Sequence, residues 1–189
     1  SEITTHTMFR NTIKNTIKSG EKILLNEEQR YVAESIIKDM ENGDMMPSLI
    51  KGVTGSGKTE VYLELIEWVI NRGGDVICLI PEISLTYQTV MRFYNRFGDI
   101  VSVINSKMSK GERYDSFEMA KSGKIRIMIG PRSALFTPFN RLSLIIIDEE
   151  HESAYKSENV PRYHARETAI ERARMSGATV ILGSATPSI

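Results

Sequence analysis

The chain has 189 residues, of which 41% are hydrophobic and 25% charged, an ordinary soluble profile for one domain with an ample core. Its 24 basic and 24 acidic residues balance, so the total charge gives no sign of a nucleic-acid partner. The single cysteine, Cys78, excludes an internal disulfide and a cysteine-built zinc site and is expected in the core. The apolar runs are too short to span a membrane and no secretory leader is visible, which favours a cytoplasmic protein without a membrane partner.

Residues 1–20 are rich in threonine and asparagine and have weak periodicity. We interpret them as a linker or a short peripheral helix. One domain is expected to occupy residues 21–189. Its first helix should begin after Asn26, a candidate N-cap with Gln29 at capping-box spacing, and should end near Glu41.

Apolar runs and helical stretches then alternate along the chain. The runs read as strands at 48–53, 76–80, 101–104, 125–129, 144–147 and 179–182, and the helices are expected near 58–71, 83–97, 109–121 and 162–175. The runs are nearly continuous in apolar residues, which is typical of parallel strands buried on both faces. The pattern predicts an α/β fold with a doubly wound parallel sheet, whose ligands lie beyond the carboxyl ends of the strands.

Residues 52–59 match the phosphate-binding pattern G-x-x-x-x-G-K-[ST], between an apolar run and a helical stretch. Glycines allow backbone N–H groups to turn around an anion, and the positive end of the helix dipole faces it. We expect Lys58 to reach the β- and γ-phosphates and the Thr59 hydroxyl to ligate Mg²⁺. The expected nucleotide contacts are Gly52, Thr54, Gly55, Ser56, Gly57, Lys58, Thr59 and Glu60. The alternative is a glycine turn with a merely solvated lysine.

A second set of candidate residues follows the apolar run that ends at Ile147. Asp148 at the strand tip is expected to hold Mg²⁺ opposite Thr59, and Glu149 to orient and deprotonate the attacking water. His151 suggests a contact between the γ-phosphate and a moving segment. An acidic patch alone would more simply be a solvated turn, but the buried strand and the separate phosphate loop favour a catalytic pair.

Charge is unevenly distributed although its total is zero. The window from Arg92 to Arg132 holds nine basic and four acidic residues. Two interpretations stay open, a set of solvated faces or a track for a polyanion along one side of the domain.

The ordered motifs resemble those of superfamily 2 helicases of the DExH type and, more narrowly, those of the bacterial replication-restart helicases. The residues that carry the resemblance are Gly52 to Glu60, Pro81-Glu82-Ile83-Ser84-Leu85-Thr86, Arg132-Ser133-Ala134-Leu135-Phe136, Asp148-Glu149-Glu150-His151, Pro161-Arg162-Tyr163-His164-Ala165-Arg166 and Ser184-Ala185-Thr186-Pro187-Ser188. The resemblance covers about residues 23–189. It departs from the family pattern at Tyr87, Pro131 and residues 157–159.

The resemblance implies an ATP- and Mg²⁺-dependent 3′-to-5′ DNA helicase, or translocase, of replication restart. Its fold would be the first RecA-like P-loop NTPase lobe of a two-lobe motor. The second lobe and its arginine finger are absent from this sequence, so the isolated lobe is expected to be weakly active or inactive. Implied partners are single-stranded and forked DNA and, in an intact protein, other replication-restart proteins.

The resemblance also implies roles for individual residues. Gln29 would contact adenine, although an exposed helix-start residue is the alternative. Ser184 and Thr186 would couple hydrolysis to movement. Single-stranded DNA would be contacted by Pro81, Glu82, Thr86, Arg132, Ser133, Tyr155 and Tyr163. Stacking of bases on the two tyrosines is reasonable, and a packed tyrosine is about equally so.

Two competing functions belong to other classes. A P-loop kinase would need a lid with an arginine cluster and an acceptor pocket, and neither is visible in the sequence. A non-hydrolysing DNA-binding or docking module is the other possibility, but the intact Glu149 argues against a degenerate site.

Overall fold

The computed structural model describes residues 3–8, 24–52, 57–149 and 164–185. In chain order the elements are β1 (Thr4–Met8), α1 (Glu27–Glu41), β2 (Ser48–Gly52), α2 (Lys58–Asn71), β3 (Asp75–Leu79), η1 (Glu82–Ser84), α3 (Tyr87–Phe97), η2 (Gly98–Ile100), β4 (Val101–Val103), α4 (Lys110–Lys121), β5 (Ile127–Gly130), η3 (Arg132–Phe136), β6 (Leu142–Ile147), α5 (Ala165–Ser176) and β7 (Thr179–Ala185). The elements labelled η are short 3-10 turns.

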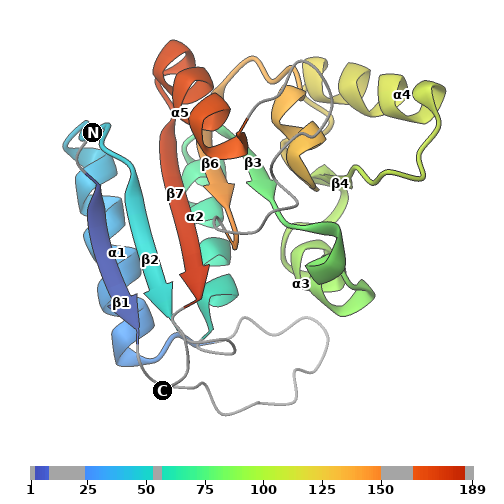
Figure 1. The fold of residues 1–189 in the computed structure, drawn as a ribbon. Coiled ribbons are helices and arrows are strands. Elements are labelled where there is room, and N and C mark those ends of the chain that lie inside the picture. The colour runs from blue at the N-terminus through green and yellow to red at the C-terminus, as the bar shows by residue number, and fades with distance from the viewer. Residues whose placement is uncertain (1–2, 9–23, 53–56, 150–163, 186–189) are drawn as a thin grey trace.

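The seven strands of the described residues form one sheet in the order β1-β2-β7-β6-β3-β5-β4, and all neighbours are parallel. Because parallel strands need crossover connections, helices cover both faces (Figure 1). The carboxyl ends of β2, β7, β6 and β3 therefore lie side by side at one edge of the sheet. The predicted doubly wound parallel sheet is confirmed.

Two hydrophobic cores lie on opposite faces of the sheet. Helices α1, α2 and α3 supply one of them, with Ile36, Leu65 and Phe93 fully buried against the strands. The second core lies under η3, α4 and α5, where small side chains of α5 such as Ala169 allow the helix to approach the strands closely. Alternate residues of β3 enter the two cores, Cys78 the first and Ile77 the second, which explains its uninterrupted apolar sequence.

The expected helix caps are present. Asn26 and Gln29 form the capping box of α1, and Ser109 and Glu112 that of α4. Gly177 ends α5 in a left-handed conformation at φ 71°. These local signals therefore set the helix boundaries as the sequence predicts.

The structure differs from the sequence expectation in two segments. Residues 4–8, expected within a linker or peripheral helix, form the edge strand β1, because the β-branched threonines of this run suit a strand that pairs with β2. The helix expected at 83–97 begins only at Tyr87. Thr86 caps it, since its side chain accepts a hydrogen bond from the Thr89 N–H at 3.2 Å, and the short turn η1 precedes it.

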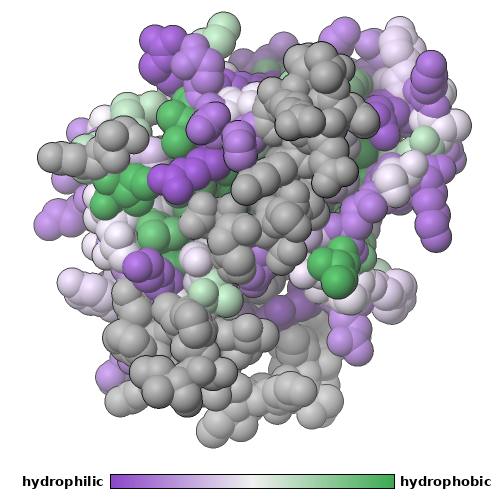
Figure 2. Space-filling model, in the orientation of Figure 1, coloured by the Kyte–Doolittle hydropathy of each residue, from purple (hydrophilic) through white to green (hydrophobic). Residues whose placement is uncertain are grey.

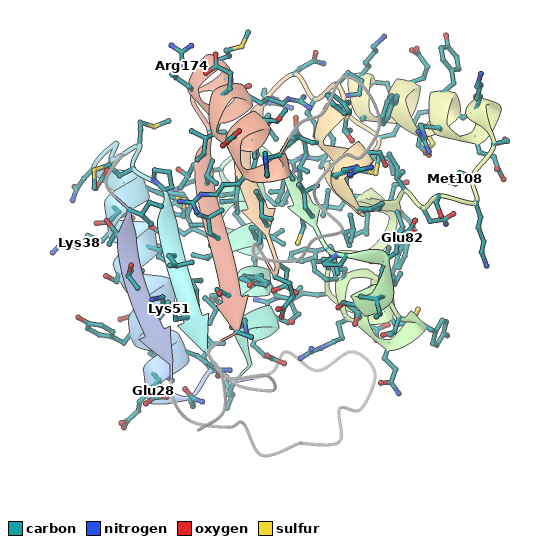
Figure 3. All side chains as sticks on the ribbon, viewed as in Figure 1. Glu28, Lys38, Lys51, Glu82, Met108 and Arg174 are labelled. Atoms are coloured by element: carbon teal, nitrogen blue, oxygen red, sulfur yellow. The ribbon has the colours of Figure 1, made fainter. Side chains whose placement is uncertain are left out.

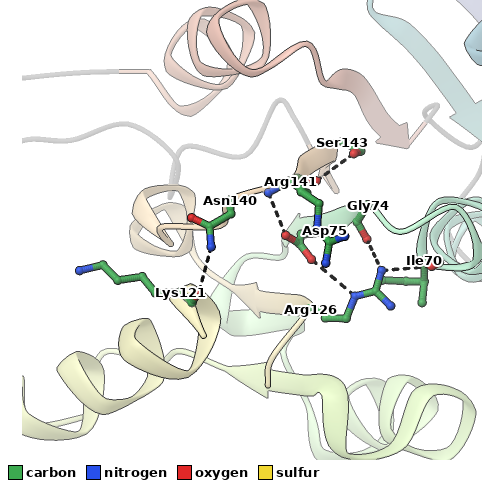
Figure 4. A network of polar contacts seen from close by, with 8 residues as sticks. All are labelled: Ile70, Gly74, Asp75, Lys121, Arg126, Asn140, Arg141 and Ser143. Carbon is green, nitrogen blue, oxygen red and sulfur yellow. Dashed lines mark hydrogen bonds and ion pairs between the residues drawn. The ribbon is translucent and has the colours of Figure 1, made fainter. Parts of the chain in front are cut away.

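An ion-pair network fixes the amino-terminal end of β3 (Figure 4). Asp75 is 5% exposed, and its carboxylate accepts a hydrogen bond from the Arg141 backbone N–H at 3.1 Å. Arg126 Nε lies 3.6 Å from Asp75 Oδ1, and Arg126 Nη2 donates to the carbonyls of Ile70 and Gly74 at 3.1 and 3.0 Å. The network ties α2, β3 and the approach to β6 together.

A second set of ion pairs joins α2 to α3. Arg96 Nη2 lies 2.8 Å from Glu64 Oε2 and 2.9 Å from Glu67 Oε2, and Arg92 pairs with Glu60. Three arginines of the basic window (Arg92, Arg96 and Arg126) are thus engaged within the domain. These ion pairs use three of the nine basic residues of the window, and their spacing in the sequence did not reveal this.

None of the helices in the described parts of the chain is long and apolar enough to cross a membrane. On the face shown in Figure 2, hydrophilic side chains gather over α5 and α4, and hydrophobic side chains also show over β1 and β2.

Candidate nucleotide site

The phosphate loop runs from the end of β2 to the start of α2. Gly57 has φ 85°, a left-handed conformation that favours glycine, and α2 begins at the next residue. The N–H groups of the first turn of α2 and the positive end of the helix dipole point toward the amino-terminal end of the helix, where no side-chain cap bonds them. This 14-residue helix therefore offers an anion the setting that the sequence predicts.

Lys58 lies inside this loop and is only 7% exposed. Its Nζ donates to the Gly52 carbonyl at 3.2 Å, across the loop to the last residue of β2. The solvated lysine of the alternative interpretation is therefore wrong. In contrast to the buried Lys58, Lys51, one residue before Gly52, is exposed to solvent (Figure 3).

Asp148 stands at the carboxyl end of β6, as expected. Its backbone N–H donates to the Leu79 carbonyl at 2.8 Å, which aligns it with the end of β3. Its Oδ1 accepts a hydrogen bond from the hydroxyl of Tyr62 on α2 at 2.7 Å. Sequence reasoning missed Tyr62, whose position three residues after Thr59 was the available signal, because residues three apart share a helix face.

Electrostatics of the site reflect burial. Desolvation raises the pKa of Asp148, while the Tyr62 hydrogen bond and the positive charge of Lys58 act to lower it. Desolvation, together with Asp148, holds the pKa of Tyr62 well above its ordinary value, so the hydroxyl keeps its proton and donates. Because α2 begins at Lys58 and its Tyr62 bonds Asp148, the start of α2 and the carboxyl end of β6 lie near each other at one edge of the sheet.

Glu149 follows Asp148 with φ 53°, among the described residues the one non-glycine in a left-handed conformation. Such a conformation costs a residue with a side chain roughly 1–3 kcal/mol. The chain turns here, directly after the last residue of β6. A strained residue at this point is consistent with the role predicted for Glu149 from the sequence.

Gln29 is 1% exposed, so the alternative of an exposed helix-start residue is wrong. Its Nε2 donates to the Gly57 carbonyl at 3.1 Å, and its Oε1 accepts from the Asn26 N–H at 2.9 Å. The glutamine thus joins the start of α1 to the phosphate loop.

Thr59 and Glu60 occupy the first turn of α2. Glu60, expected among the nucleotide contacts, is 7% exposed and pairs with Arg92 of α3. Ser184 lies on β7 opposite Lys51 of β2, beside the phosphate loop. The remaining expected residues of this site lie outside the described residues, namely Thr54, Gly55, Ser56, His151 and Thr186.

The residues present fit a nucleotide with Mg²⁺. A buried lysine at the start of α2 and a half-buried carboxylate with a hydroxyl donor lie at the same edge. Mg²⁺ takes oxygen ligands from one or two protein groups and from phosphates. Thr59 and Asp148 would supply those oxygens. Lys58 would exchange its bond to the Gly52 carbonyl for phosphate oxygens.

The segments expected to contact DNA follow β3 and β5 at the same edge. Pro81 is buried, whereas Glu82 and Thr86 are exposed, and the Glu82 carboxylate accepts from the Ser106 N–H at 2.7 Å. Figure 3 shows Glu82 near α3 and Met108 in the connection to α4. Ile83 and Tyr87 are 84% and 78% exposed, which leaves apolar side chains in solvent beside the predicted contacts.

Arg132 and Ser133 belong to η3, whose middle residues Ala134 and Leu135 are buried. The partly buried Arg172 of α5 holds the end of this turn, because its guanidinium donates to the carbonyls of Leu135 and Thr137. Burial lowers the pKa of Arg172 from its usual value. Sequence reasoning missed this link, although Arg172 sits in the alanine-rich buried face of α5. Tyr155 and Tyr163 lie outside the described residues.

Comparisons with known proteins show the family of the chain. Residues 22–189 match the family described as "Type III restriction enzyme, res subunit". The chain is 49% identical over 172 residues to the "Replication restart protein PriA" of Bacillus subtilis (strain 168), covering 91% of this chain and 21% of that protein. It is 50% identical over 141 residues to the protein of the same name from Haemophilus influenzae, covering 75% of this chain and 19% of that protein.

The chain therefore spans about a fifth of the length of these relatives. Among solved structures, "The crystal structure of T4 UvsW" superposes with a TM-score of 0.59 at 16% identity, over 92% of this chain and 34% of that one. This likeness shows the fold, an α/β lobe of the RecA-like type.

Proposed function

The chain belongs to the family of the type III restriction enzyme res subunit, and from this premise we propose that it is the first ATP-binding motor lobe of a replication-restart DNA helicase. The relatives that carry the name "Replication restart protein PriA" support the biological setting. The proposal assigns ATP and Mg²⁺ as cofactors, single-stranded and forked DNA as substrates, and the cytoplasm as location. Other replication-restart proteins would be its partners.

One observation carries the proposal, the convergence of Lys58 and Asp148 at the carboxyl edge of the sheet. Lys58, freed from the Gly52 carbonyl, would neutralise the β- and γ-phosphates. Asp148 and Thr59 would hold Mg²⁺, which supplies charge neutralisation for the transferred phosphoryl group when bound. Glu149 would orient the attacking water and accept its proton.

The DNA-facing part of the lobe would be formed by the segments after β3 and β5. Thr86 and Arg132 offer polar contacts for the phosphodiester backbone, and the exposed Ile83 and Tyr87 lie next to them. Because these segments and the nucleotide site share one edge of the sheet, a change at the phosphates has a short path to the bound strand. Ser184 would belong to that path, together with His151 and Thr186, whose positions are not described.

The test is ATP hydrolysis with and without single-stranded DNA. A polypeptide in which this lobe is joined to a second motor lobe is expected to hydrolyse ATP, and DNA is expected to stimulate the rate. The 189-residue chain alone is expected to turn over little, because a missing arginine finger costs about 10³ to 10⁵ in rate. DNA stimulation separates a motor from a P-loop kinase and from a passive docking module. Robust DNA-stimulated turnover by the chain alone would contradict the division into two required lobes.

A further inference from the structure

Tyr62 is a buried tyrosine whose hydroxyl contacts the proposed nucleotide site. The side chain is 1% exposed and lies in the core between α2 and the sheet, where a phenylalanine would fill nearly the same volume. A hydroxyl in such a core is costly unless it is hydrogen-bonded. The bond it makes, 2.7 Å to Asp148 Oδ1, is to the carboxylate that the proposed function assigns to Mg²⁺.

We propose that Tyr62 is a positioning residue that fixes the orientation of the Asp148 carboxylate for Mg²⁺ and nucleotide, an inference that rests on the proposed function. Tyr62 comes from α2, the helix that begins in the phosphate loop, and shares a helix face with Thr59. One rigid helix therefore carries Lys58 and Thr59 and also holds the acid that faces them. This bond links the helix that begins at Lys58 to the carboxyl end of β6.

Gly183 of β7 gives independent support. A Cβ atom at this position would lie 1.7 Å from the Tyr62 hydroxyl oxygen and 3.1 Å from Asp148 Oδ1. Backbone of β7 thus passes directly against the Tyr62–Asp148 pair, and only glycine leaves room for it. The next residue is Ser184, from the segment expected to couple hydrolysis to movement, so the pair also lies against the first residues of that segment.

A positioning role and a packing role of Tyr62 have different consequences. Without the hydroxyl, the ring still fills the core, but Asp148 Oδ1 loses its 2.7 Å donor from α2, and the Glu149 backbone N–H alone does not tie the carboxylate to that helix. Removing a residue that orients a metal ligand typically weakens metal binding about 10- to 100-fold. A packing role predicts instead a change in stability with no change in the response to Mg²⁺.

The test is the Mg²⁺-dependent gain in affinity of the 189-residue chain for the non-hydrolysable ATP analogue AMP-PNP, measured by calorimetry with Mg²⁺ and with EDTA. Tyr62→Phe is expected to reduce this gain about tenfold and to leave the affinity in EDTA within about twofold. Tyr94→Phe is the matched control, because Tyr94 packs at the edge of the same core. It is expected to leave both affinities unchanged.

A second variant, Gly183→Ala, tests the contact between the Tyr62 hydroxyl and Asp148 from the side of β7. Alone, it is expected to reduce the same gain and to lower Tm, because its methyl group displaces the Tyr62 hydroxyl. In the Tyr62→Phe background, the ring atom nearest to the added Cβ is Cζ at 3.0 Å. Gly183→Ala is therefore expected to cause a smaller loss of Tm and of the Mg²⁺-dependent gain in affinity in that background. Equal losses in both backgrounds would contradict the role of the hydroxyl.

The outcomes separate the inference from the proposed function. A normal gain in the unmodified chain that Tyr62→Phe leaves unaltered overturns the inference alone. An unmodified chain whose affinity does not respond to Mg²⁺ overturns the proposed nucleotide function, and the inference with it. A selective loss in Tyr62→Phe, with the Tyr94→Phe control unchanged, supports both.

Discussion

The fold surrounds two aspartates at opposite ends of the parallel strands very differently, the buried Asp75 and the half-buried Asp148. Asp75, at the amino end of β3, is paired with Arg126 and bonded to the Arg141 backbone, and the arginine in turn binds two carbonyls (Figure 4). Asp148, at the carboxyl end of β6, has a neutral tyrosine hydroxyl as its 2.7 Å donor, and desolvation raises its pKa. Ion pairing compensates the Asp75 carboxylate. The pKa of Asp148 stays raised by desolvation, although the Tyr62 hydroxyl, the Lys58 charge and the Glu149 backbone N–H act to lower it.

The difference separates structural from functional charge. A compensated carboxylate at the amino edge joins α2, β3 and the start of β6, and so contributes to stability. At the carboxyl edge, the raised pKa of Asp148, the buried Lys58 on a backbone carbonyl and the strained Glu149 are local features that stability alone would not select. Substitutions at the two edges should therefore have opposite effects on activity and stability.

The largest effect is expected for Lys58→Ala in a polypeptide that carries both motor lobes. The variant should lose at least about 10²-fold in ATP hydrolysis, because it removes the charge that would meet the phosphates, and Tm should change little. Lys51→Ala is the matched control, since this exposed lysine lies on the adjoining strand and should leave the rate unchanged. Retained hydrolysis in Lys58→Ala would exclude the proposed phosphate role.

Asp75→Ala should lower the stability of the protein and leave ATP hydrolysis unchanged, the reverse of Lys58→Ala. Breaking a buried ion pair costs about 3 kcal/mol, and the lower end of the usual range applies because Arg126 keeps its bonds to Ile70 and Gly74. Urea unfolding measures this loss. Hydrolysis per folded molecule should stay unchanged below the transition. A variant that stays as stable as the unmodified protein would refute the structural role of the network.

Asp148→Asn should combine lost hydrolysis with a stability change smaller than that of Asp75→Ala and opposite in sign. Since the folded-state pKa of Asp148 is raised, its contribution to stability is present below the unfolded-state pKa and is lost as pH rises through the folded-state pKa. Asparagine does not ionise, so the variant does not lose this contribution to stability as pH rises. Its Tm should exceed that of the unmodified protein at neutral pH, and the two Tm values should converge in acid. Thermal scans across pH measure the difference, and a lower Tm at neutral pH would contradict it.

The smallest effect concerns Cys78, the buried residue before the last one of β3. Burial raises its thiol pKa well above the ordinary value, so thiol reagents should not label the folded protein at neutral pH. One thiol per chain should react after unfolding. Prompt labelling of the native state would show that the sheet opens at β3, and would contradict a rigid core between the structural and the functional aspartate.

Much of this architecture follows from the sequence. The six expected strands, the capping boxes at Asn26 and Ser109 and the position of Asp148 depend on local patterns, and the structure confirms them. The family resemblance is confirmed as well, because its motifs are short and ordered along the chain.

The missed features depend on partners far apart in sequence. Tyr62 and Asp148 are 86 residues apart, and Arg172 and Leu135 are 37 apart, so no window along the chain shows these pairs. The threonine-rich β1 lacks apolar periodicity, and only its pairing with β2 makes it a strand. The roles expected for individual site residues, including Gln29 at adenine and Arg132 at DNA, stay predictions.

The most direct measurement of the central claim is a crystal structure of this chain with AMP-PNP and Mg²⁺. We expect Lys58 Nζ to leave the Gly52 carbonyl and contact the β- and γ-phosphates, with Mg²⁺ between Thr59 and Asp148. A triphosphate bound elsewhere, with Lys58 still on the Gly52 carbonyl, would contradict the account.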